Sequence, residues 1–394
     1  MNNWKIKKLR DIAEINPKET LKKGSVCKKI SMDKLIPYCR DIDDFELDAF
    51  NGGAKFRNGD TIMARITPCL ENGKISQINC LNQDEVGFGS TEFIVFRAKE
   101  GVDKDFLYYL IISDLVKQPA IKSMVGSSGR QRVQNDVVAD LDIKIPELSE
   151  QRRIGALLKV LDDKIHINGQ INKNLEAQAN SIFFNKCIAI KSIPLNWEKG
   201  NLTDIANFTN GLAMQKFRPK KNEIGIPVLK IAELRQGRCD KNSDLCSPSI
   251  DSNYIVHDGD VIFSWSGSLI VDFWTGGKCG LNQHLFNVNS SHFEKWFYYS
   301  WTKYYLNKFI SIASDKATTM GHIKREDLTK AEVLIPSVND YTSIGNEVSP
   351  LYELLISNRI QNRQLELLRD NLLPKIVTGQ LDLSDLKYGE FMKS

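Results

Sequence analysis

The chain has 394 residues, enough for two or three domains, and its 42% hydrophobic and 26% charged residues are typical of a globular protein. The net charge of +4 is too small to indicate a polyanionic partner by itself. Apolar runs stay short of the roughly 18 residues that cross a membrane, and the eight cysteines contain no Cys-x-x-Cys pair. We therefore expect a cytoplasmic protein without membrane contact, disulfide framework or structural zinc.

The first part of the chain, residues 1–147, is predicted to be a globular domain. It opens with the motif W-x4-L-x-D-I-A at Trp4, and short β-like runs with turn signals follow. Asn58-Gly59 supplies the positive φ angles of a tight hairpin, so it predicts a strand–turn–strand. The aromatic segment 106–110 is predicted to be a helix in the core. We interpret this domain as mixed α and β with many short strands.

A long helix is predicted at residues 148–190, because apolar residues and two asparagines recur there in alternating steps of three and four. This pattern is typical of the seam of a coiled coil. A buried asparagine costs stability but favours a partner with a facing asparagine, so the two are expected to fix the register. The predicted pairing residues of this helix are Leu161, Ile165, Asn168, Asn172 and Leu175.

The second part of the chain repeats the first. The motif W-x4-L-x-D-I-A returns at Trp197, 193 positions after Trp4, and Asp258-Gly259 repeats the turn signal before a strand. Residues 191–337 are therefore predicted to be a second domain of the same kind, with an aromatic core segment at 296–299. A repeat of this length indicates a domain with a linker helix, since solenoid units are far shorter.

A second long helix is predicted at residues 338–382, before a tail at 383–394, because Ile335-Pro336 repeats an Ile-Pro pair that stands 190 positions earlier. Pro350 inside this helix predicts either a kink or a fresh start with Ser349 as the cap. The predicted pairing residues of the second helix are Leu351, Leu355, Asn358, Asn362 and Leu365. We infer that the two helices pack against each other or against matched helices in a partner.

Several motifs resemble one protein family. Residues 146–155, which read PELSEQRRIG, and the LDDKI run after them resemble the central conserved helix of type I restriction–modification specificity subunits. Residues 372–375, which read LLPK, and Gly379 are similar to the end of that family's C-terminal conserved helix. The two Trp-led motifs are similar to the starts of its target-recognition domains. The second copy departs from the pattern at Asp340-Tyr341, where the family usually has Glu-Gln, as in Glu150-Gln151.

The resemblance implies an α+β fold with a pseudo-two-fold internal repeat. Two mixed α/β target-recognition domains would be separated by two long conserved helices that form an antiparallel coiled coil. The resemblance also implies that this chain has no catalytic residues, bound cofactor or metal. Each recognition domain would read one half of a split site in double-stranded DNA, while the helices dock two methyltransferase subunits that bind S-adenosylmethionine. A motor-nuclease subunit would join that complex to restrict unmethylated DNA.

The length of the helical seam agrees with that geometry. From position 158 to 182 there are 24 residue steps, or roughly 36 Å of helix at a rise of 1.5 Å per residue. This length corresponds to about one turn of B-DNA, which is the distance between successive major grooves on one face of the duplex. The sequence therefore predicts a bipartite site with an unread spacer. Because the two domains differ in sequence, the half-sites are expected to differ too.

Candidate DNA contacts lie in polar and basic loops at strand ends. Hydroxyl groups and glycine backbones suit phosphates, whereas Arg, Gln and Glu can read base edges. In the first domain the candidates are Arg65, Ser90, Thr91, Glu92, Ser127, Ser128, Arg130, Gln131 and Arg132. In the second domain they are Ser264, Ser266, Gln283, His284, Thr318, Thr319, His322, Lys324 and Arg325. The alternative interpretation is structural: solvated loops, strand-edge caps, an ion pair of Arg65 with a local carboxylate, and a core position for Trp265.

Two other classes of function fit the sequence less well. An adenine methyltransferase needs an Asn-Pro-Pro-aromatic run, whereas Asn16-Pro17 is followed by lysine, and no Gly-x4-Gly-Lys-Ser/Thr motif indicates a P-loop motor. A DNA-binding or coiled-coil scaffold without a restriction partner leaves the two unlike domains unexplained. DNA binding would separate a scaffold from a reader, and methylation by the chain alone would favour the enzyme.

Overall fold

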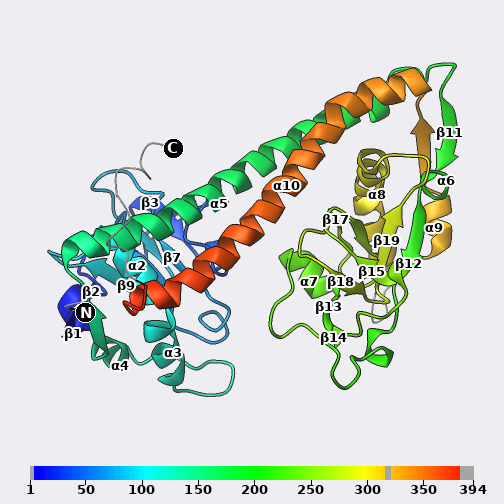
Figure 1. The fold of residues 1–394 in the computed structure, drawn as a ribbon. Helices are drawn as coiled ribbons and strands as arrows, with labels where there is room; N and C mark the ends of the chain where they lie inside the picture. The colour runs from blue at the N-terminus through cyan, green and yellow to red at the C-terminus, as the bar shows by residue number, and fades with distance from the viewer. Residues whose placement is uncertain (1–3, 316–320, 382–394) are drawn as a thin grey trace. The chain divides into compact units, whose positions relative to one another are not determined.

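The computed structural model describes residues 4–315 and 321–381 (Figure 1). The chain divides into two compact units, of which the first combines residues 1–166 with 365–394 and the second comprises residues 167–364. Each unit contains one globular part and a portion of both long helices. Among the described residues, no helix is both long enough and apolar enough to cross a membrane.

The described strands of the first unit form three sheets. A two-stranded antiparallel sheet pairs β1 (Lys5–Lys8) with β10 (Asp142–Ile145) and joins the two ends of the globular part. An antiparallel sheet has the order β2 (Ala13–Ile15), β9 (Phe93–Ala98), β6 (Thr61–Ala64), β7 (Ile75–Gln77). A mixed sheet has the order β4 (Glu46–Ala49), β3 (Val26–Ile30), β8 (Gly87–Gly89), β5 (Ala54–Phe56), and its β3 and β8 are parallel.

The second unit repeats this topology strand by strand. Its two-stranded sheet pairs β11 (Glu198–Asn201) with β20 (Glu332–Ile335). Its antiparallel sheet has the order β12 (Asn207–Asn210), β19 (Leu285–Asn289), β16 (Val261–Ser264), β17 (Val271–Phe273). Its mixed sheet has the order β14 (Leu245–Cys246), β13 (Ile226–Leu229), β18 (Cys279–Leu281), β15 (Ile255–Val256), again with one parallel pair, β13 and β18. The predicted internal repeat and the α+β class are thus confirmed.

Helices cover the sheets in both units. In the first unit these are α1 (Leu9–Ile12), α2 (Lys104–Ile112), α3 (Asp114–Lys122), α4 (Asn135–Ala139) and the short η1 (Met32–Lys34). In the second unit they are α6 (Leu202–Ile205), α7 (Ile231–Gln236), α8 (Lys295–Asp315), α9 (Arg325–Thr329) and the short η3 (Met214–Lys216) and η4 (Ser252–Tyr254). The aromatic segments of α2 and α8 are buried, as predicted, including Tyr108, Tyr109, Trp296 and Phe297.

The two glycine turns differ from the prediction. Gly59 and Gly259 do adopt positive φ angles, of 88° and 89°. However, the strands on either side of each turn belong to different sheets: β5 pairs with β8, whereas β6 pairs with β7 and β9. The predicted strand–turn–strand is confirmed at both positions, but the expectation that the two strands pair as a hairpin is wrong, because each turn is a corner at which the chain passes from the mixed sheet to the antiparallel one. Strand pairing is decided by partners that lie far away in the sequence.

The long helices α5 (Leu148–Phe183) and α10 (Val338–Val377) pack against each other, and a π-helical turn, η2 (Phe184–Ile188), follows α5 (Figure 1). In the second unit Asn168 bonds to Asn362 and Asn358 bonds to Asn172. The residue numbers of the bonded partners rise along α5, from 168 to 172, and fall along α10, from 362 to 358, so the two helices are antiparallel. In the first unit α5 and α10 meet through a buried ion pair between Asp162 and Arg369, 2.7 Å apart.

Helix α10 continues through Pro350 without a break, so the predicted fresh start at Ser349 is wrong. Proline removes one backbone hydrogen bond from a helix. Here Pro350 lies on the exposed side, while Val348 and Tyr352 on either side of it are buried in the core of the second unit. Burial of these side chains outweighs the loss of one hydrogen bond and keeps the helix continuous.

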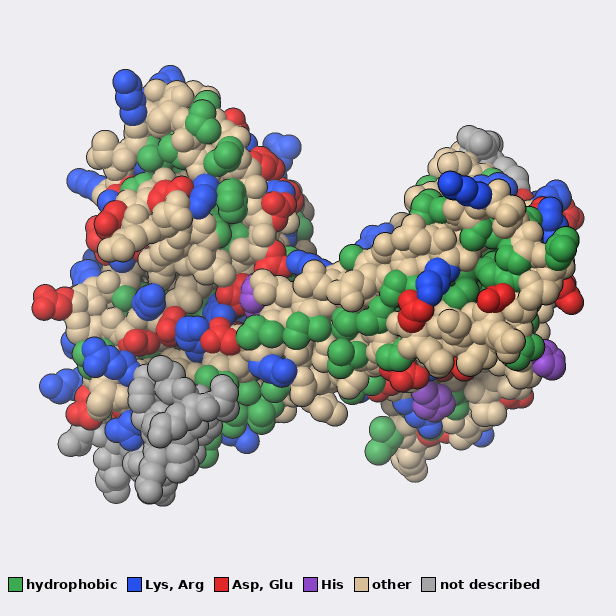
Figure 2. Space-filling view, turned by 90° about the horizontal axis from the view of Figure 1, so that it is seen from above, with side chains coloured by type: hydrophobic (Ala, Val, Ile, Leu, Met, Phe, Trp, Pro, Cys, Tyr) green, Lys and Arg blue, Asp and Glu red, His purple; other side chains and the backbone are tan. Residues whose placement is uncertain are grey.

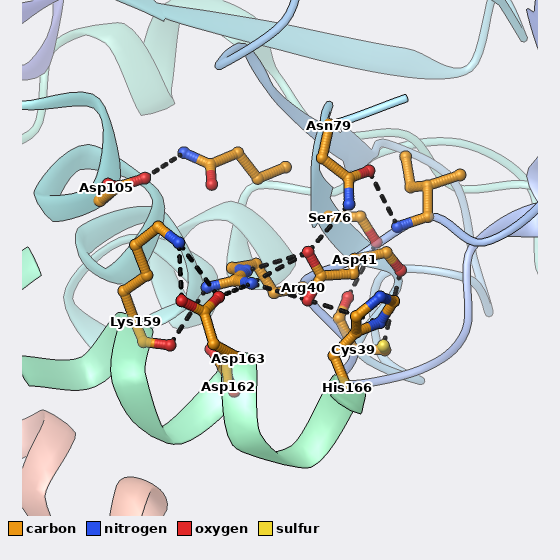
Figure 3. Close-up of polar contacts among 12 residues, drawn as sticks. Cys39, Arg40, Asp41, Ser76, Asn79, Asp105, Lys159, Asp162, Asp163 and His166 are labelled. Carbon is orange, nitrogen blue, oxygen red and sulfur yellow. Dashed lines mark hydrogen bonds and ion pairs between the residues drawn. The ribbon is translucent and has the colours of Figure 1, made fainter. Parts of the chain in front are cut away.

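A polar network fastens α5 to the loop around Arg40 in the first unit (Figure 3). Arg40 donates to Asp41 at 2.8 Å and to Asp163 at 2.5 Å, and Lys159 donates to Asp163 at 2.8 Å. Asn79 also donates to Asp41, at 2.9 Å. Burial acts to raise the pKa of Asp163, but hydrogen bonds from Lys159 and Arg40 outweigh it and hold that pKa below its usual range.

Candidate nucleic-acid interface

Three of the loops singled out in the sequence meet in the first unit. They are the end of β6 at Arg65, the segment before β9 at Glu92, and the loop 125–133. The backbone N–H of Arg65 donates to the Glu92 carbonyl at 2.9 Å, and that of Val133 donates to the Arg65 carbonyl at 2.9 Å. An isolated β-bridge between Ile66 and Arg132 joins the first loop to the third. The structure thus brings these candidates together.

Glu92 and Arg132 form an ion pair in this cluster. Arg132 Nε donates to both carboxylate oxygens of Glu92 at 3.0 Å, and Arg132 Nη2 donates to Oε1 at 2.7 Å. The hydrogen bond from Arg132 holds the pKa of Glu92 below its usual range, against the opposing effect of burial. The Arg132 side chain is 45% exposed and that of Glu92 is 24% exposed, so the pair lies at the surface.

Arg65 has a structural position in the same cluster. Its Nη2 donates to the Val133 carbonyl at 3.3 Å, and within the described residues it forms no ion pair with a carboxylate. The alternative interpretation of an Arg65 ion pair is therefore wrong. Because its side chain is half-buried and bonded to the backbone of the loop 125–133, Arg65 holds this loop against β6.

The tip of the loop 125–133 is exposed, and it contains Ser127, Ser128 and Arg130. Gly126 and Gly129 adopt φ angles of 137° and 77°, which side chains disfavour, so the turn requires glycine there. In the neighbouring segment, Ser90 Oγ accepts a hydrogen bond from the Glu92 N–H at 3.1 Å, which is the strand-edge cap of the alternative interpretation. Thr91 is exposed and Gln131 is half-buried.

The equivalent loops meet in the second unit. The Trp265 N–H donates to the His284 carbonyl at 3.4 Å, and the Ile323 N–H donates to the Trp265 carbonyl at 3.1 Å. A β-bridge joins Ser266 to His322, at the place where Ile66 and Arg132 are bridged in the first unit. The end of β16, the segment before β19 and the loop before α9 therefore form one cluster.

Aromatic side chains dominate this second cluster. The Trp265 ring lies 6.1 Å from the His284 ring and 6.3 Å from the His322 ring. Ser266 Oγ and His284 Nδ1 are hydrogen-bonded at 2.9 Å, and Trp265 Nε1 donates to Asn210 Oδ1 at 2.9 Å. Trp265 packs against the core of the second unit but is only half-buried, so part of its side chain remains exposed at the cluster.

The other second-unit candidates lie in different surroundings. Ser264 is fully buried, and its hydroxyl donates to the Ser268 carbonyl at 2.9 Å, so it shapes the turn. Gln283 is half-buried, whereas Lys324 and Arg325 are exposed at the start of α9. Arg325 Nη2 also donates to the Phe208 carbonyl at 3.3 Å. The candidates Thr318 and Thr319 lie outside the described residues.

The asparagines of the helix pair face one another as the pattern predicted. Asn168 is fully buried, and its Nδ2 donates to Gln361 Oε1 at 2.7 Å and to Asn362 Oδ1 at 2.8 Å. Asn358 Nδ2 donates to Asn172 Oδ1 at 3.0 Å. The neighbouring pairing residues Leu175 and Leu355 are buried, and Leu161, Ile165, Leu351 and Leu365 are half-buried.

A family model described as the type I restriction modification DNA specificity domain matches this chain twice, at residues 1–177 and 194–367. The chain belongs to this family. Such a chain is the specificity component of its system and is non-catalytic, with catalysis carried by partner subunits. The family supports a role in DNA sequence specificity.

Individual specificity subunits are similar over much of their length. The chain is 27% identical over 315 residues to the type I restriction enzyme MjaIX specificity subunit of Methanocaldococcus jannaschii, covering 73% of this chain and 71% of that one. It is 25% identical to the EcoKI specificity subunit of Escherichia coli strain K12, covering 94% and 89%. A crystal structure of a type I S subunit from M. genitalium has a similar fold, with a TM-score of 0.56, 14% identity and coverage of 95% and 96%.

Asp340 and Tyr341, which depart from the specificity-subunit pattern, make the same kinds of contact in the second unit as Glu150 and Gln151 make in the first. Trp4 Nε1 donates to Glu150 at 3.2 Å, and Trp197 Nε1 donates to Asp340 at 2.8 Å. Likewise, Gln151 Oε1 accepts a hydrogen bond from the backbone N–H of Asp103 at 3.0 Å. The Tyr341 hydroxyl accepts one from the backbone N–H of Glu294 at 2.7 Å. Both acceptors cap the aromatic helix of their unit, so different residues provide the same two anchors.

Sequence reasoning missed two parts of this specificity subunit. Asn210 and Trp265 belong to the second cluster, and the position of Trp265 as the counterpart of Arg65 was the signal that could have identified it. The buried ion pair of Asp162 with Arg369, to which Tyr109 donates a hydrogen bond of 2.6 Å, was also missed. A search for apolar periodicity cannot find a seam that is polar at these positions.

Proposed function

We propose that this chain reads a bipartite, asymmetric DNA site, with one half-site for each unit. The observation that supports this proposal most strongly is that equivalent loops meet at the same strand ends in both units but present different side chains. The first cluster has Glu92 and Arg132, whereas the second has Trp265, His284 and His322. Since side chains of this kind discriminate base edges, unlike clusters on equivalent scaffolds favour unlike half-sites.

We further propose that the paired helices set the spacer and dock two methyltransferase subunits. Large apolar side chains are exposed on both helices, and Figure 2 shows such side chains gathered along them. The exposed residues are Val160, Ile167, Ile171, Val338, Leu354, Leu367 and Leu368. Large apolar side chains that stay exposed on both helices support a protein partner. In this proposal the partners bind S-adenosylmethionine, this chain binds no cofactor, and a motor-nuclease subunit completes the restriction complex.

The test is to co-express the chain with its methyltransferase subunits and to map modified bases across the host genome by long-read sequencing. A single bipartite motif with a fixed spacer is expected, and it would give both half-sites at once. An assembled complex that methylates no bipartite motif would overturn the proposal and leave a scaffold protein.

A further inference from the structure

The ion pair between Glu92 and Arg132 occupies only one edge of the guanidinium group. Glu92 accepts from Nε and from one N–H of Nη2. A guanidinium carries five N–H donors, so the second N–H of Nη2 and both N–H groups of Nη1 are left over. Within the described residues no protein group accepts a hydrogen bond from Nη1 of Arg132. The remaining edge is a fork of two parallel donors.

Backbone contacts also fix the position of Arg132. Its N–H donates to the Val125 carbonyl at 2.9 Å, and its carbonyl accepts from the Val125 N–H at 3.1 Å. A second bridge joins Arg132 to Ile66. A side chain that is held at its backbone and at one edge loses little conformational freedom when it binds a ligand. The free edge of Arg132 is therefore pre-organised for bidentate recognition.

We propose that Arg132 recognises a guanine in the half-site read by the first unit, and that Glu92 is the residue that positions its guanidinium. A fork of two parallel donors matches O6 and N7 of guanine in the major groove. The inference rests on the proposed function and names one base of its target. In the second unit His284 and His322 occupy the places of Glu92 and Arg132, so this arginine fork has no counterpart at the same place in the second unit.

The competing use of Arg132 is a contact to a DNA phosphate. A phosphate contact weakens binding about equally at all sequences, whereas a base contact relaxes the sequence requirement at one position. The identity of the methylated motif therefore separates the two roles, and a residue that merely supports the fold would not change that identity.

The experiment compares methylation motifs from complexes that contain wild-type chain, R132Q, R132K or E92Q. For R132Q we expect methylation at sites with another base in place of one guanine of the first half-site, and an unchanged second half-site. Preference for the guanine should fall about 5- to 150-fold, the range of one bidentate base contact. R132K keeps the charge but loses the fork, so it should relax the same position, and E92Q should do so more weakly.

R130Q is the matched control, because it removes one positive charge from the exposed tip of the same loop. It is expected to lower methylation without relaxing any position. The inference is overturned if R132Q or R132K gives less methylation at an unchanged motif, or if the wild-type half-site of the first unit contains no guanine. Absence of any bipartite motif from wild-type complexes is a different result, because it would overturn the proposed function itself.

Discussion

At the scale of single residues, two different side chains have the same role as a helix cap. Gln151 and Tyr341 each accept a backbone N–H at the start of the aromatic helix of their unit. Burial raises the pKa of Tyr341 to about 12, so its hydroxyl stays protonated over the physiological range. The ring also packs 5.0 Å from Trp296. Tyr341 therefore accepts the same kind of backbone hydrogen bond as Gln151, and its ring adds an apolar contact with Trp296.

This equivalence predicts the effect of Tyr341→Phe. The substitution keeps the ring but removes the acceptor for the N–H of residue 294, so the chain should lose about 1 kcal/mol of unfolding free energy. Urea denaturation measures the loss. Tyr304→Phe is the control, since Tyr304 is exposed and its hydroxyl forms no hydrogen bond within the described residues. Equal stability of the two variants would contradict the capping role.

Asp163 gives a pH-dependent prediction. Its pKa is lowered in the folded chain, so its contribution to stability is present above the ordinary aspartate pKa of about 3.9 and is lost as the pH falls through the folded value. Asp163→Asn removes this contribution. The wild-type chain should be more stable than D163N at pH 7, and the difference should shrink below about pH 4. Urea midpoints at pH 7, 4 and 3 test this; a constant difference would exclude the ion pair as its cause.

Loop residues could be predicted at this scale only in part. Arg132 and Glu92 were identified because glycines and charges mark an exposed loop, and both side chains do lie at the surface. Ser264 has the same residue type as Ser127, yet it is fully buried, because its turn folds back over it. Burial of a loop residue depends on contacts with distant segments, such as the bridge between Ser266 and His322, which the local sequence does not encode.

At the scale of elements, helix periodicity was the most informative signal. Facing asparagines were inferred from spacing alone, and the pairs Asn168 with Asn362 and Asn172 with Asn358 are hydrogen-bonded. Strand pairing was harder to predict, because each strand is short and its partners lie far away in the chain. The turn at Gly59 shows the difference. Its positive φ angle was predicted correctly, but the strands that flank it join different sheets.

The asparagine pairs predict the effect of Asn168→Ile. The substitution removes two hydrogen bonds and places an apolar group opposite Gln361 and Asn362. We expect impaired assembly with the methyltransferase subunits or an altered spacer length, because the asparagines fix the register of the helices. Size-exclusion chromatography and methylation mapping measure these effects. The double variant N168I/N362I should recover part of the lost stability, since Asn362 is then replaced as well and Gln361 is the one former partner of residue 168 that stays polar. Unchanged assembly and target in N168I would refute the register role.

At the scale of the whole molecule, the repeat was visible because both copies keep the residues that anchor the scaffold. Trp4 with Glu150 and Trp197 with Asp340 are the same anchor in two units. Gly155 and Gly345 stand at equivalent, tightly packed positions: an added Cβ would lie 2.7 Å from a carboxylate oxygen of Asp103 in one unit and 3.0 Å from Trp296 Nε1 in the other. The clusters at the strand ends carry different side chains in the two units, although the strand topology is the same.

This division between scaffold and loops predicts the outcome of a domain exchange. Replacement of residues 1–147 by those of another specificity subunit should change only one half-site. The segment carries its own closing ladder, from Lys5 with Ile145 to Lys8 with Asp142, and the contacts among Arg65, Glu92 and Arg132 lie inside it. Its loops should therefore keep their shape in a new chain, as methylation mapping of the exchanged chain can establish.

The exchange also depends on contacts that cross the boundary to α5. Trp4 donates to Glu150, Gln151 caps α2, and Tyr109 donates to Asp162. A donor segment that has Trp and Tyr at these positions should dock on α5 of this chain, whereas one without them should fail to assemble because buried polar groups would lose their partners. A compatible donor that changed both half-sites would show that the units do not read DNA independently, since no residue of the second unit was altered.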